Sequence, residues 1–254
     1  MRVAVAGASG NIGSLAVAAL RRHGHDPVPI SRSHGVDLLT GRGLDEALAG
    51  VEVVVDAISA PPADREPTVA YFATAAQNLL KAEQQAGVQH HVLLSIVGLH
   101  RIEGNAHYFG KREQERIVSA GQVPWTIVPV TQFFDFAVTV ASWTERDGTA
   151  YIPPLLVQPI APADVAEVLV DIAGGTPQGQ HRDVAGPEPQ DLVDMARRTH
   201  HAQGRVAKLV PTWESILGLD MAGNVLLPGP NARIAPTTFE DWLAYQEAQR
   251  PSPR

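Results

Sequence analysis

The chain has 254 residues, of which 44% are hydrophobic, and its 20 Lys and Arg against 27 Asp and Glu give a formal charge of −7. This length suits one α/β domain, and the acidic balance argues against a general nucleic-acid binder or a basic membrane-surface protein. The sequence has no cysteine, which excludes disulfides, a thiol nucleophile and a cysteine metal site. It contains no recognisable signal peptide and no apolar run that could span a bilayer, so we expect a cytoplasmic protein without membrane or nucleic-acid partners.

Strands and helices alternate along the first half of the chain. Apolar, β-branched runs predict strands at Val3–Ala6, Asp26–Ile30, Val51–Ile58, His91–Ile96 and Trp125–Val128. Helical periodicity between them predicts helices at Ile12–His23, Leu44–Leu48, Val69–Ala86 and Tyr108–Ala120. This alternation predicts an α/β fold, a doubly wound parallel sheet with helices on both faces.

The pattern becomes looser after about residue 130, where prolines are frequent. Helical segments are predicted at Ala163–Ala173 and Gln190–His201, and a hydroxyl at Thr237 or Thr238 caps a last helix. We expect residues 1–254 to form a single domain, with a core of about 1–135. A small substrate-covering region of about 136–254 is expected over the carboxyl ends of the strands.

The first predicted strand leads into a glycine-rich turn, Gly7-Ala8-Ser9-Gly10-Asn11-Ile12-Gly13. Gly7 permits a tight turn, Gly10 lets the backbone approach a pyrophosphate, and Gly13 lets the following helix lie close to the sheet. The helix N-terminus offers free N–H groups and the positive end of its dipole to an anion. The spacing is G-x-x-G-x-x-G, yet the strand before it and the helix after it indicate a dinucleotide-phosphate site.

The end of the second predicted strand indicates which dinucleotide is bound. Ser31, Arg32 and Ser33 follow that strand, and no acid occurs before Asp37. An acidic residue here would favour NAD, whereas a guanidinium and two hydroxyls suit the 2′-phosphate of NADP. We therefore expect NADPH to be preferred over NADH, with Asp37 beside the adenine.

Several motifs together resemble the atypical short-chain dehydrogenase/reductases, and within them the NmrA-like, NAD(P)H-binding branch. They are the glycine motif, Val55-Asp56-Ala57-Ile58-Ser59, Leu93-Leu94-Ser95-Ile96-Val97-Gly98 followed by Lys111, Thr126-Ile127-Val128-Pro129-Val130-Thr131-Gln132-Phe133-Phe134, and Pro162-Ala163-Asp164-Val165-Ala166. The resemblance spans nearly the whole chain and is densest over residues 1–135.

The resemblance implies a Rossmann fold that binds NADP together with a small-molecule substrate. Gly7, Ser9, Gly10, Asn11, Ile12 and Gly13 would hold the pyrophosphate. Arg32, between Ser31 and Ser33, would meet the 2′-phosphate. The residues implied along the rest of the dinucleotide are Ala57, Ile58, Ser59, Val128 and Lys111, the last at the nicotinamide ribose.

The catalytic pattern departs from that of the wider superfamily, which uses serine with tyrosine and lysine as Y-x-x-x-K. Ser95 and Lys111 match, but His107 stands four residues before the lysine and Tyr108 only three. Three interpretations are open: His107 acts as the acid or base, Tyr108 acts in a shifted geometry, or neither residue acts. Under the third, the pair packs at the start of its helix.

Other residues give weaker signals. Gln132, Phe133, Phe134 and Phe136 line either an apolar substrate pocket or the core, and the resemblance favours the pocket for Gln132 and Phe133. Trp143 and Tyr151 could extend such an aromatic wall. The pairs His90-His91 and His200-His201 are not expected to bind metal, because adjacent residues face different ways. Glu113 and Glu115 are expected on a solvated helix face.

These observations favour an NADPH-dependent oxidoreductase acting on a small apolar or aromatic carbonyl, quinone or enone. Two other functions are consistent with the displaced tyrosine: a non-catalytic, redox-sensing NADP(H)-binding regulator, and a non-redox isomerase or epimerase. The sequence leaves the substrate and the oligomeric state open, a homodimer included.

Overall fold

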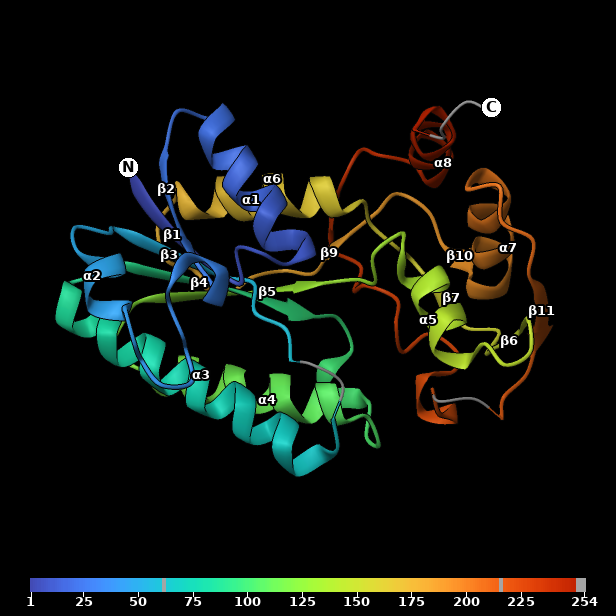
Figure 1. Cartoon of the computed structure of the whole chain (residues 1–254), viewed down its shortest axis with the longest axis horizontal. Coiled ribbons are helices and arrows are strands. Elements are labelled where there is room, and N and C mark those ends of the chain that lie inside the picture. The colour runs from blue at the N-terminus through green and yellow to red at the C-terminus, as the bar shows by residue number, and fades with distance from the viewer. Residues whose placement is uncertain (61–62, 215–216, 250–254) are drawn as a thin grey trace. The chain divides into compact units, whose positions relative to one another are not determined.

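The computed structural model describes residues 1–60, 63–214 and 217–249 (Figure 1). Contacts divide the chain into two units, Met1–Pro129 with Pro162–Arg182 and Val130–Ala161 with the chain from Asp183 onward. This division differs from the boundary expected near residue 135, because residues 162–182 return to the first unit. The single-domain assignment stays a prediction.

The first unit contains the predicted parallel sheet. Across the sheet, its strands are β5 (Trp125–Val130), β4 (His90–Ile96), β3 (Val53–Asp56), β1 (Arg2–Ala6) and β2 (Asp26–Ile30), with β8 (Gly179–Gln180) beside β5. The chain passes from β1 to β2 on one side and then to β3 on the other, so its direction across the sheet reverses at β1. Open α/β sheets bind ligands outside the carboxyl ends of their strands at such a reversal.

Helices cover both faces of this sheet, as predicted (Figure 1). α1 (Asn11–Arg22) packs beside α6 (Pro162–Ala173) on one face, and α3 (Arg65–Ala86) beside α4 (Ala106–Ala120) on the other. The short helix α2 (Leu44–Leu48) contacts α3. The described part of this unit also contains the 3-10 turns η1 (Arg32–His34) and η2 (Leu99–Arg101). The interior between α3 and the sheet holds large apolar side chains, including Ile30, Phe72, Leu79 and Leu93.

Helices α3 and α4 begin more than one residue earlier than predicted, for local reasons. α3 can include Pro67 because this proline lies in the first turn of the helix. Backbone N–H groups there have no intrahelical acceptor, so the missing N–H of proline costs no hydrogen bond. α4 begins at Ala106 because the Asn105 side chain caps it by accepting a hydrogen bond from the Tyr108 N–H at 3.2 Å. Strand β3 covers only the middle of the predicted Val51–Ile58 run.

The second unit is built from short elements. They are α5 (Phe136–Thr144), β6 (Thr149–Ile152), β7 (Leu156–Val157), β9 (Val184–Ala185), β10 (Gln190–Asp191), α7 (Leu192–Ala202), β11 (Lys208–Pro211), η3 (Leu219–Met221), β12 (Arg233–Ile234) and α8 (Phe239–Ala248). β11 pairs with β6 and β12 with β9 in parallel, and β10 pairs with β7 antiparallel. The rings of Phe134, Phe239 and Trp242 pack together, with centroids 5.3–5.7 Å apart.

The sequence predicted this unit less completely. Helix α5 was missed because valines and threonines, which have low helix propensity, interrupt its pattern. The cap of α8 is confirmed, since the Thr238 hydroxyl accepts a hydrogen bond from the Asp241 N–H at 3.1 Å. Among the described residues, no helix combines the length and apolarity needed to cross a membrane.

Candidate functional site

The carboxyl ends of β1 and β3 meet at Gly7, where the direction across the sheet reverses. Gly7 has φ +79°, and a Cβ placed on it would lie 2.7 Å from the carbonyl oxygen of Ala57. Its N–H donates to the carbonyl of Ile30 at 3.0 Å, which ties the turn to β2. Only glycine meets both the left-handed conformation and the close approach, so this turn has the tight geometry that the motif predicted.

The other two glycines shape the start of α1. A Cβ on Gly13 would overlap the carbonyl oxygen of Gly7, so the helix can lie this close to the turn only with glycine there. Gly10 is the N-cap of α1, no side chain caps it, and its Cβ would approach only the Gly7 oxygen within 4 Å. Ser9, Gly10 and Asn11 are exposed, whereas Ile12 and Gly13 are buried. The turn therefore leaves an uncapped helix N-terminus that can accept an anion.

A polar cluster follows β2. The Ser31 hydroxyl is hydrogen-bonded to the Ser33 hydroxyl at 2.9 Å and to His34 Nδ1 at 2.7 Å. Arg32 is exposed and makes no ion pair with the residues that the structure describes. Asp37 is half-buried, and its carboxylate accepts a hydrogen bond from the Leu39 N–H at 2.9 Å. The structure thus brings the predicted 2′-phosphate residues together and adds His34, which the sequence analysis did not select.

The residues that follow β3 form the turn next to Gly7. Ala57 donates its N–H to Ala6 at 3.0 Å, Ile58 is buried, and Ser59 is exposed. The Ile58 N–H donates to Asp56 Oδ1 at 3.1 Å, so the last side chain of β3 fixes the shape of this turn.

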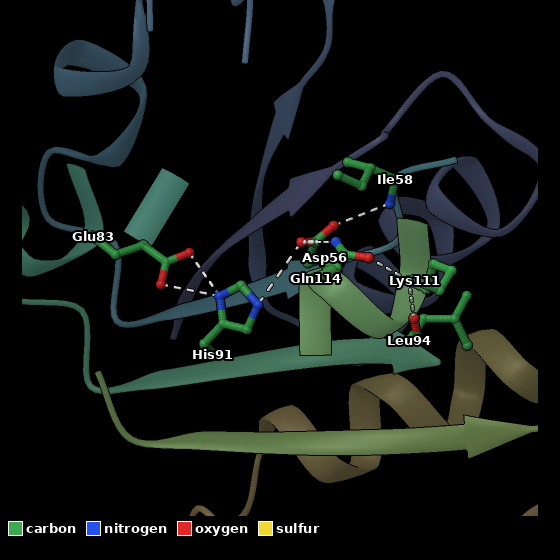
Figure 2. Close-up of polar contacts among 7 residues, drawn as sticks. All are labelled: Asp56, Ile58, Glu83, His91, Leu94, Lys111 and Gln114. Atoms are coloured by element: carbon green, nitrogen blue, oxygen red, sulfur yellow. Dashed lines mark hydrogen bonds and ion pairs between the residues drawn. The ribbon is translucent and has the colours of Figure 1, made fainter. Parts of the chain in front are cut away.

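Lys111, on α4, is buried, with 3% of its surface exposed. Its ammonium donates to the carbonyl of Leu94 at 2.6 Å and to Gln114 Oε1 at 2.6 Å (Figure 2). Burial lowers the pKa of Lys111 to about 8, although the charges of Asp56 and Glu115 act in the opposite direction. The lysine can therefore exchange a proton closer to neutral pH than an exposed lysine does.

Ser95 is buried at the edge of this region, and its hydroxyl donates to Glu115 Oε1. The other oxygen of Glu115 is hydrogen-bonded to His100 Nε2 at 2.6 Å. The expectation that Glu115 lies on a solvated helix face is wrong, because only 8% of this residue is exposed. The Glu115 carboxylate lies between the buried Ser95 hydroxyl and His100 of η2. Glu113, by contrast, pairs with Arg116 on the outer face of α4.

His107 and Lys111 lie one turn apart on α4 and share a neighbour. The Phe72 ring meets the His107 ring edge to face at 5.3 Å, and Lys111 Nζ lies 5.4 Å from the centre of the same ring. Burial, followed by the charge of Lys111, lowers the pKa of His107 to about 4, so its imidazole is neutral at pH 7. Tyr108 is buried on the next position of the helix.

The predicted nicotinamide and substrate residues differ in environment. Val128 is fully buried in β5, so we do not include it in the proposed site. Gln132 is 8% exposed, and both polar atoms of its side chain lack a hydrogen-bond partner in the described chain. Phe133 and Phe136 are half-buried, whereas Phe134 belongs to the core. Trp143 and Tyr151 are exposed.

The paired histidines face opposite ways on β4, as argued from strand geometry. His90 Nε2 is hydrogen-bonded to the Thr126 hydroxyl at 2.8 Å, and His91 Nδ1 to Glu83 at 2.9 Å. Across residues 1–60, 63–214 and 217–249, no three His, Asp or Glu side chains gather as a metal ligand set would.

Four buried polar residues of this region were not predicted from the sequence as part of the site: Asp56, Glu83, Gln114 and Glu115. Asp56 carried a usable signal, because it is a lone acid at the end of an otherwise apolar strand. The other three lie on amphipathic helices among exposed acids and amides, and nothing in the spacing separates them from solvated neighbours.

Comparison with solved structures shows the fold. MoeE5 in complex with UDP-glucuronic acid and NAD is 19% identical, covers 98% of both chains and has a TM-score of 0.74. For dTDP-4-dehydrorhamnose reductase from Bacillus anthracis in complex with NADP, the values are 14% identity, coverage of 98% of this chain and 99% of that chain, and a TM-score of 0.75. The NADPH-dependent quinone oxidoreductase QOR2 from Escherichia coli is 16% identical, with coverage of 83% and 78% and a TM-score of 0.64.

No curated protein sequence gives a significant match to the chain. A family model described as NAD(P)H-binding, however, matches residues 7–174, which include the glycine turn, the η1 cluster and Lys111. The match confirms the family expected from the motifs: the chain belongs to the NAD(P)H-binding family, and its fold is Rossmann-like.

Proposed function

We propose that the chain is an NADPH-dependent oxidoreductase that acts on a small apolar or aromatic carbonyl, quinone or enone. One observation carries the choice of cofactor. After the end of β2, Arg32 is exposed and lies between Ser31 and Ser33 in the sequence, and no acid occurs before Asp37. A guanidinium with hydroxyls suits a phosphate dianion, whereas NAD-preferring sites place a carboxylate there.

The residues present fit the rest of a dinucleotide. The uncapped N-terminus of α1 would bind the pyrophosphate through its backbone N–H groups, with Ser9 and Asn11 exposed beside it. The turn of Ala57, Ile58 and Ser59 would lie along the dinucleotide. When bound, the reduced nicotinamide supplies a hydride.

Lys111 is the group best suited to hold the nicotinamide ribose. An ammonium has three donors, and two of them reach Leu94 and Gln114. The third N–H would donate to a ribose hydroxyl of the cofactor. This is the role that the resemblance implies for Lys111. His107, which is neutral at pH 7, is not assigned as the proton donor.

Gln132 supports a substrate contact just beyond the end of β5. A buried primary amide without a hydrogen-bond partner is energetically unfavourable, and the carbonyl oxygen of a substrate would accept a hydrogen bond from its Nε2. Phe133 and Phe136 would supply apolar surface. The quinone oxidoreductase among the structural neighbours agrees with such a substrate.

The test is NADPH oxidation, followed at the nicotinamide absorbance, against a panel of quinones, aromatic ketones and enones. We expect turnover with at least one class, and loss of most of the substrate affinity in Gln132→Leu with NADPH binding retained. Tight NADPH binding without turnover of any of these compounds would contradict the proposed reaction.

A second candidate is a regulator that senses the redox state of NADP. The Ser95–Glu115 hydrogen bond favours it, because the hydroxyl that active relatives use on substrate is already engaged. A regulator requires different affinities for NADPH and NADP⁺ that are linked to partner binding. Equal affinities for the two forms would rule it out.

A further inference from the structure

A continuous chain of buried polar groups runs beneath the sheet on the side of α3 and α4 (Figure 2). Glu83 of α3 is hydrogen-bonded to His91 Nδ1 at 2.9 Å, and His91 Nε2 lies 3.8 Å from Asp56 Oδ2. The same Asp56 oxygen accepts a hydrogen bond from Gln114 Nε2 at 2.8 Å. Gln114 Oε1 in turn accepts from Lys111. Four elements, α3, β4, β3 and α4, therefore contribute to one connected set.

Asp56 is the branch point of this chain. Its Oδ2 faces His91 and Gln114, while its Oδ1 accepts the Ile58 N–H at 3.1 Å (Figure 2). Ile58 belongs to the turn that approaches Gly7, where the cofactor is proposed to bind. A shift of this turn would thus change a hydrogen bond of the carboxylate that also anchors Gln114.

The Gln114 amide has a fixed orientation in this buried set of polar groups. Its nitrogen must donate to the Asp56 carboxylate, and its oxygen must accept from the ammonium, so rotating the amide would break both bonds. The amide therefore transmits the position of Asp56 to the charge of Lys111.

The formal charges of this connected set of buried side chains cancel. With Glu83 and Asp56 ionised and with His91 and Lys111 protonated, two negative charges face two positive ones. Burial acts to lower the pKa of His91, but attraction to Glu83 and to Asp56 raises it above its usual value. Opposite charges in contact offset the unfavourable burial of each one.

Groups from several elements surround the Lys111 ammonium and influence its protonation. Burial opposes its charged form, whereas Asp56 of β3 and Glu115 of α4 favour it. His91 of β4 faces Asp56, and the charge of Lys111 acts to lower the pKa of His91. His107 of α4 is neutral at pH 7, and Phe72 of α3 presents its ring. Glu83 acts mainly on His91.

We propose that Asp56 and Gln114 are positioning residues that link the turn at residues 57–59 to the Lys111 ammonium, so that binding of the cofactor and protonation of Lys111 are coupled. The proposal rests on the proposed cofactor site. Because the dinucleotide is an anion, its binding favours the charged ammonium. By reciprocity, the protonated protein binds it more tightly.

The first experiment measures the proton of Lys111 directly, without cofactor. The chain has three lysines, Lys81, Lys111 and Lys208, so labelling lysine with ¹³C at Cε gives three NMR signals. Lys81 and Lys208 are exposed and serve as internal references. We expect the Lys111 signal to titrate near pH 8.

Substitutions of Gln114 test the link with opposite signs. Gln114→Leu fills a similar volume without the amide and should lower the pKa of Lys111 from about 8 to about 7. Gln114→Glu places a carboxylate beside the ammonium and should raise it. Asp56→Asn removes the main charge that favours the protonated form of Lys111 and should lower the pKa of Lys111. This variant provides a second test if Gln114→Leu does not fold.

The control is Glu113→Gln on the adjacent position of α4, where the side chain pairs with Arg116 on the outer face. It removes a charge from the same helix and should leave the Lys111 titration unchanged. Equal effects of the Gln114 and Glu113 variants would overturn the positioning role.

The second experiment measures NADP⁺ affinity by calorimetry between pH 7 and 9.5 and repeats the NMR titration with saturating NADP⁺. We expect the dissociation constant to rise about fivefold or more over this range. Bound NADP⁺ should raise the pKa of Lys111. In Asp56→Asn, the pH at which the affinity for NADP⁺ begins to fall should be lower.

The outcomes separate this inference from the proposed function. If NADP⁺ does not bind at any pH, the proposed cofactor site is wrong. If it binds with the same affinity throughout and leaves the Lys111 titration unchanged, the site stands and the coupling is wrong.

Discussion

Two regions of the first unit handle polar groups in opposite ways. The turn from β1 into α1, together with the cluster after β2, keeps its polar groups at the surface: the helix N-terminus has no cap and Arg32 is exposed. The region under β3 and β4 buries Asp56, His91 and Lys111 and gives each one an ionic or hydrogen-bonded partner. The exposed region suits recognition of a phosphate, and the buried one suits positioning.

This difference predicts two kinds of mutational effect. Changes in the exposed region should weaken ligand binding and leave folding intact, because water replaces whatever the side chain bound. Changes in the buried region should lower the free energy of unfolding, because a charged partner is left without compensation.

The largest effect is expected for Asp56→Ala. The substitution leaves His91 and Gln114 facing a cavity and should reduce the free energy of unfolding by about 3–5 kcal/mol. Asp26→Ala is the control, since its side chain is 68% exposed and 3.8 Å from Arg2, and should change stability by about 0.5 kcal/mol or less. Urea denaturation measures both; similar losses would contradict the contrast between the regions.

Acidification should destabilise the protein through histidines whose pKa is lowered in the folded state. His90 and His107 have a pKa of about 4 in the folded protein, whereas an unfolded histidine titrates near 6.5. Below pH 6.5 the unfolded state therefore binds more protons than the folded state, and stability falls as the pH falls. The loss between pH 6.5 and 5 should be about 2–4 kcal/mol.

The variant His107→Gln should remove about half of the loss that is due to His90 and His107, because one of these two groups is absent. Thermal or urea unfolding at a series of pH values measures it. A stability that stays constant from pH 6.5 to 5 would show that these histidines are hydrated and protonate freely.

Within the exposed region, the backbone of the glycine turn packs closely against the turn that follows β3. Gly7→Ala combines an unfavourable φ with a Cβ 2.7 Å from Ala57 and should lower stability by about 2–3 kcal/mol. Gly24→Ala has a similar φ of +74° with nothing within 4 Å of its Cβ, so it should lower stability by only about 1 kcal/mol. Equal losses would mean that the approach of Gly7 to Ala57 relaxes freely.

The exposed region was the more predictable from sequence. Its signals are local: glycine spacing between a strand and a helix, and residue types just beyond a strand. The doubly wound sheet was equally readable, because β-branched runs alternate with helical periodicity. The buried chain joins Asp56, Glu83, His91 and Gln114 from four separate elements, so only the packing of α3 and α4 reveals it.

Long-range contacts also account for the two wrong or missing predictions, the exposure of Glu115 and helix α5. Glu115 has the spacing of a surface residue, and its hydrogen bonds to Ser95, across the helix–sheet interface, and to His100 show it to be a buried partner. Helix α5 has strand-like residues whose helical state is stabilised by packing within the second unit. Local patterns predict local structure, and long-range pairing decides the rest.

Arg32→Ala should have the smallest effect on stability and a selective effect on binding. Removing a guanidinium that meets a 2′-phosphate should weaken NADPH binding about 10- to 100-fold, and NADH binding should be unchanged. Arg21→Ala removes the same charge from the exposed far end of α1 and should leave both affinities unchanged. A parallel loss of NADH affinity in Arg32→Ala would indicate general electrostatic attraction.

The most direct test of the central claim is calorimetric titration of the unmodified protein with NADPH and with NADH at the same ionic strength. The proposed site predicts that NADPH binds at least about tenfold more tightly, a difference of about 1.4 kcal/mol. Tighter binding of NADH, or no binding of either dinucleotide, would contradict it.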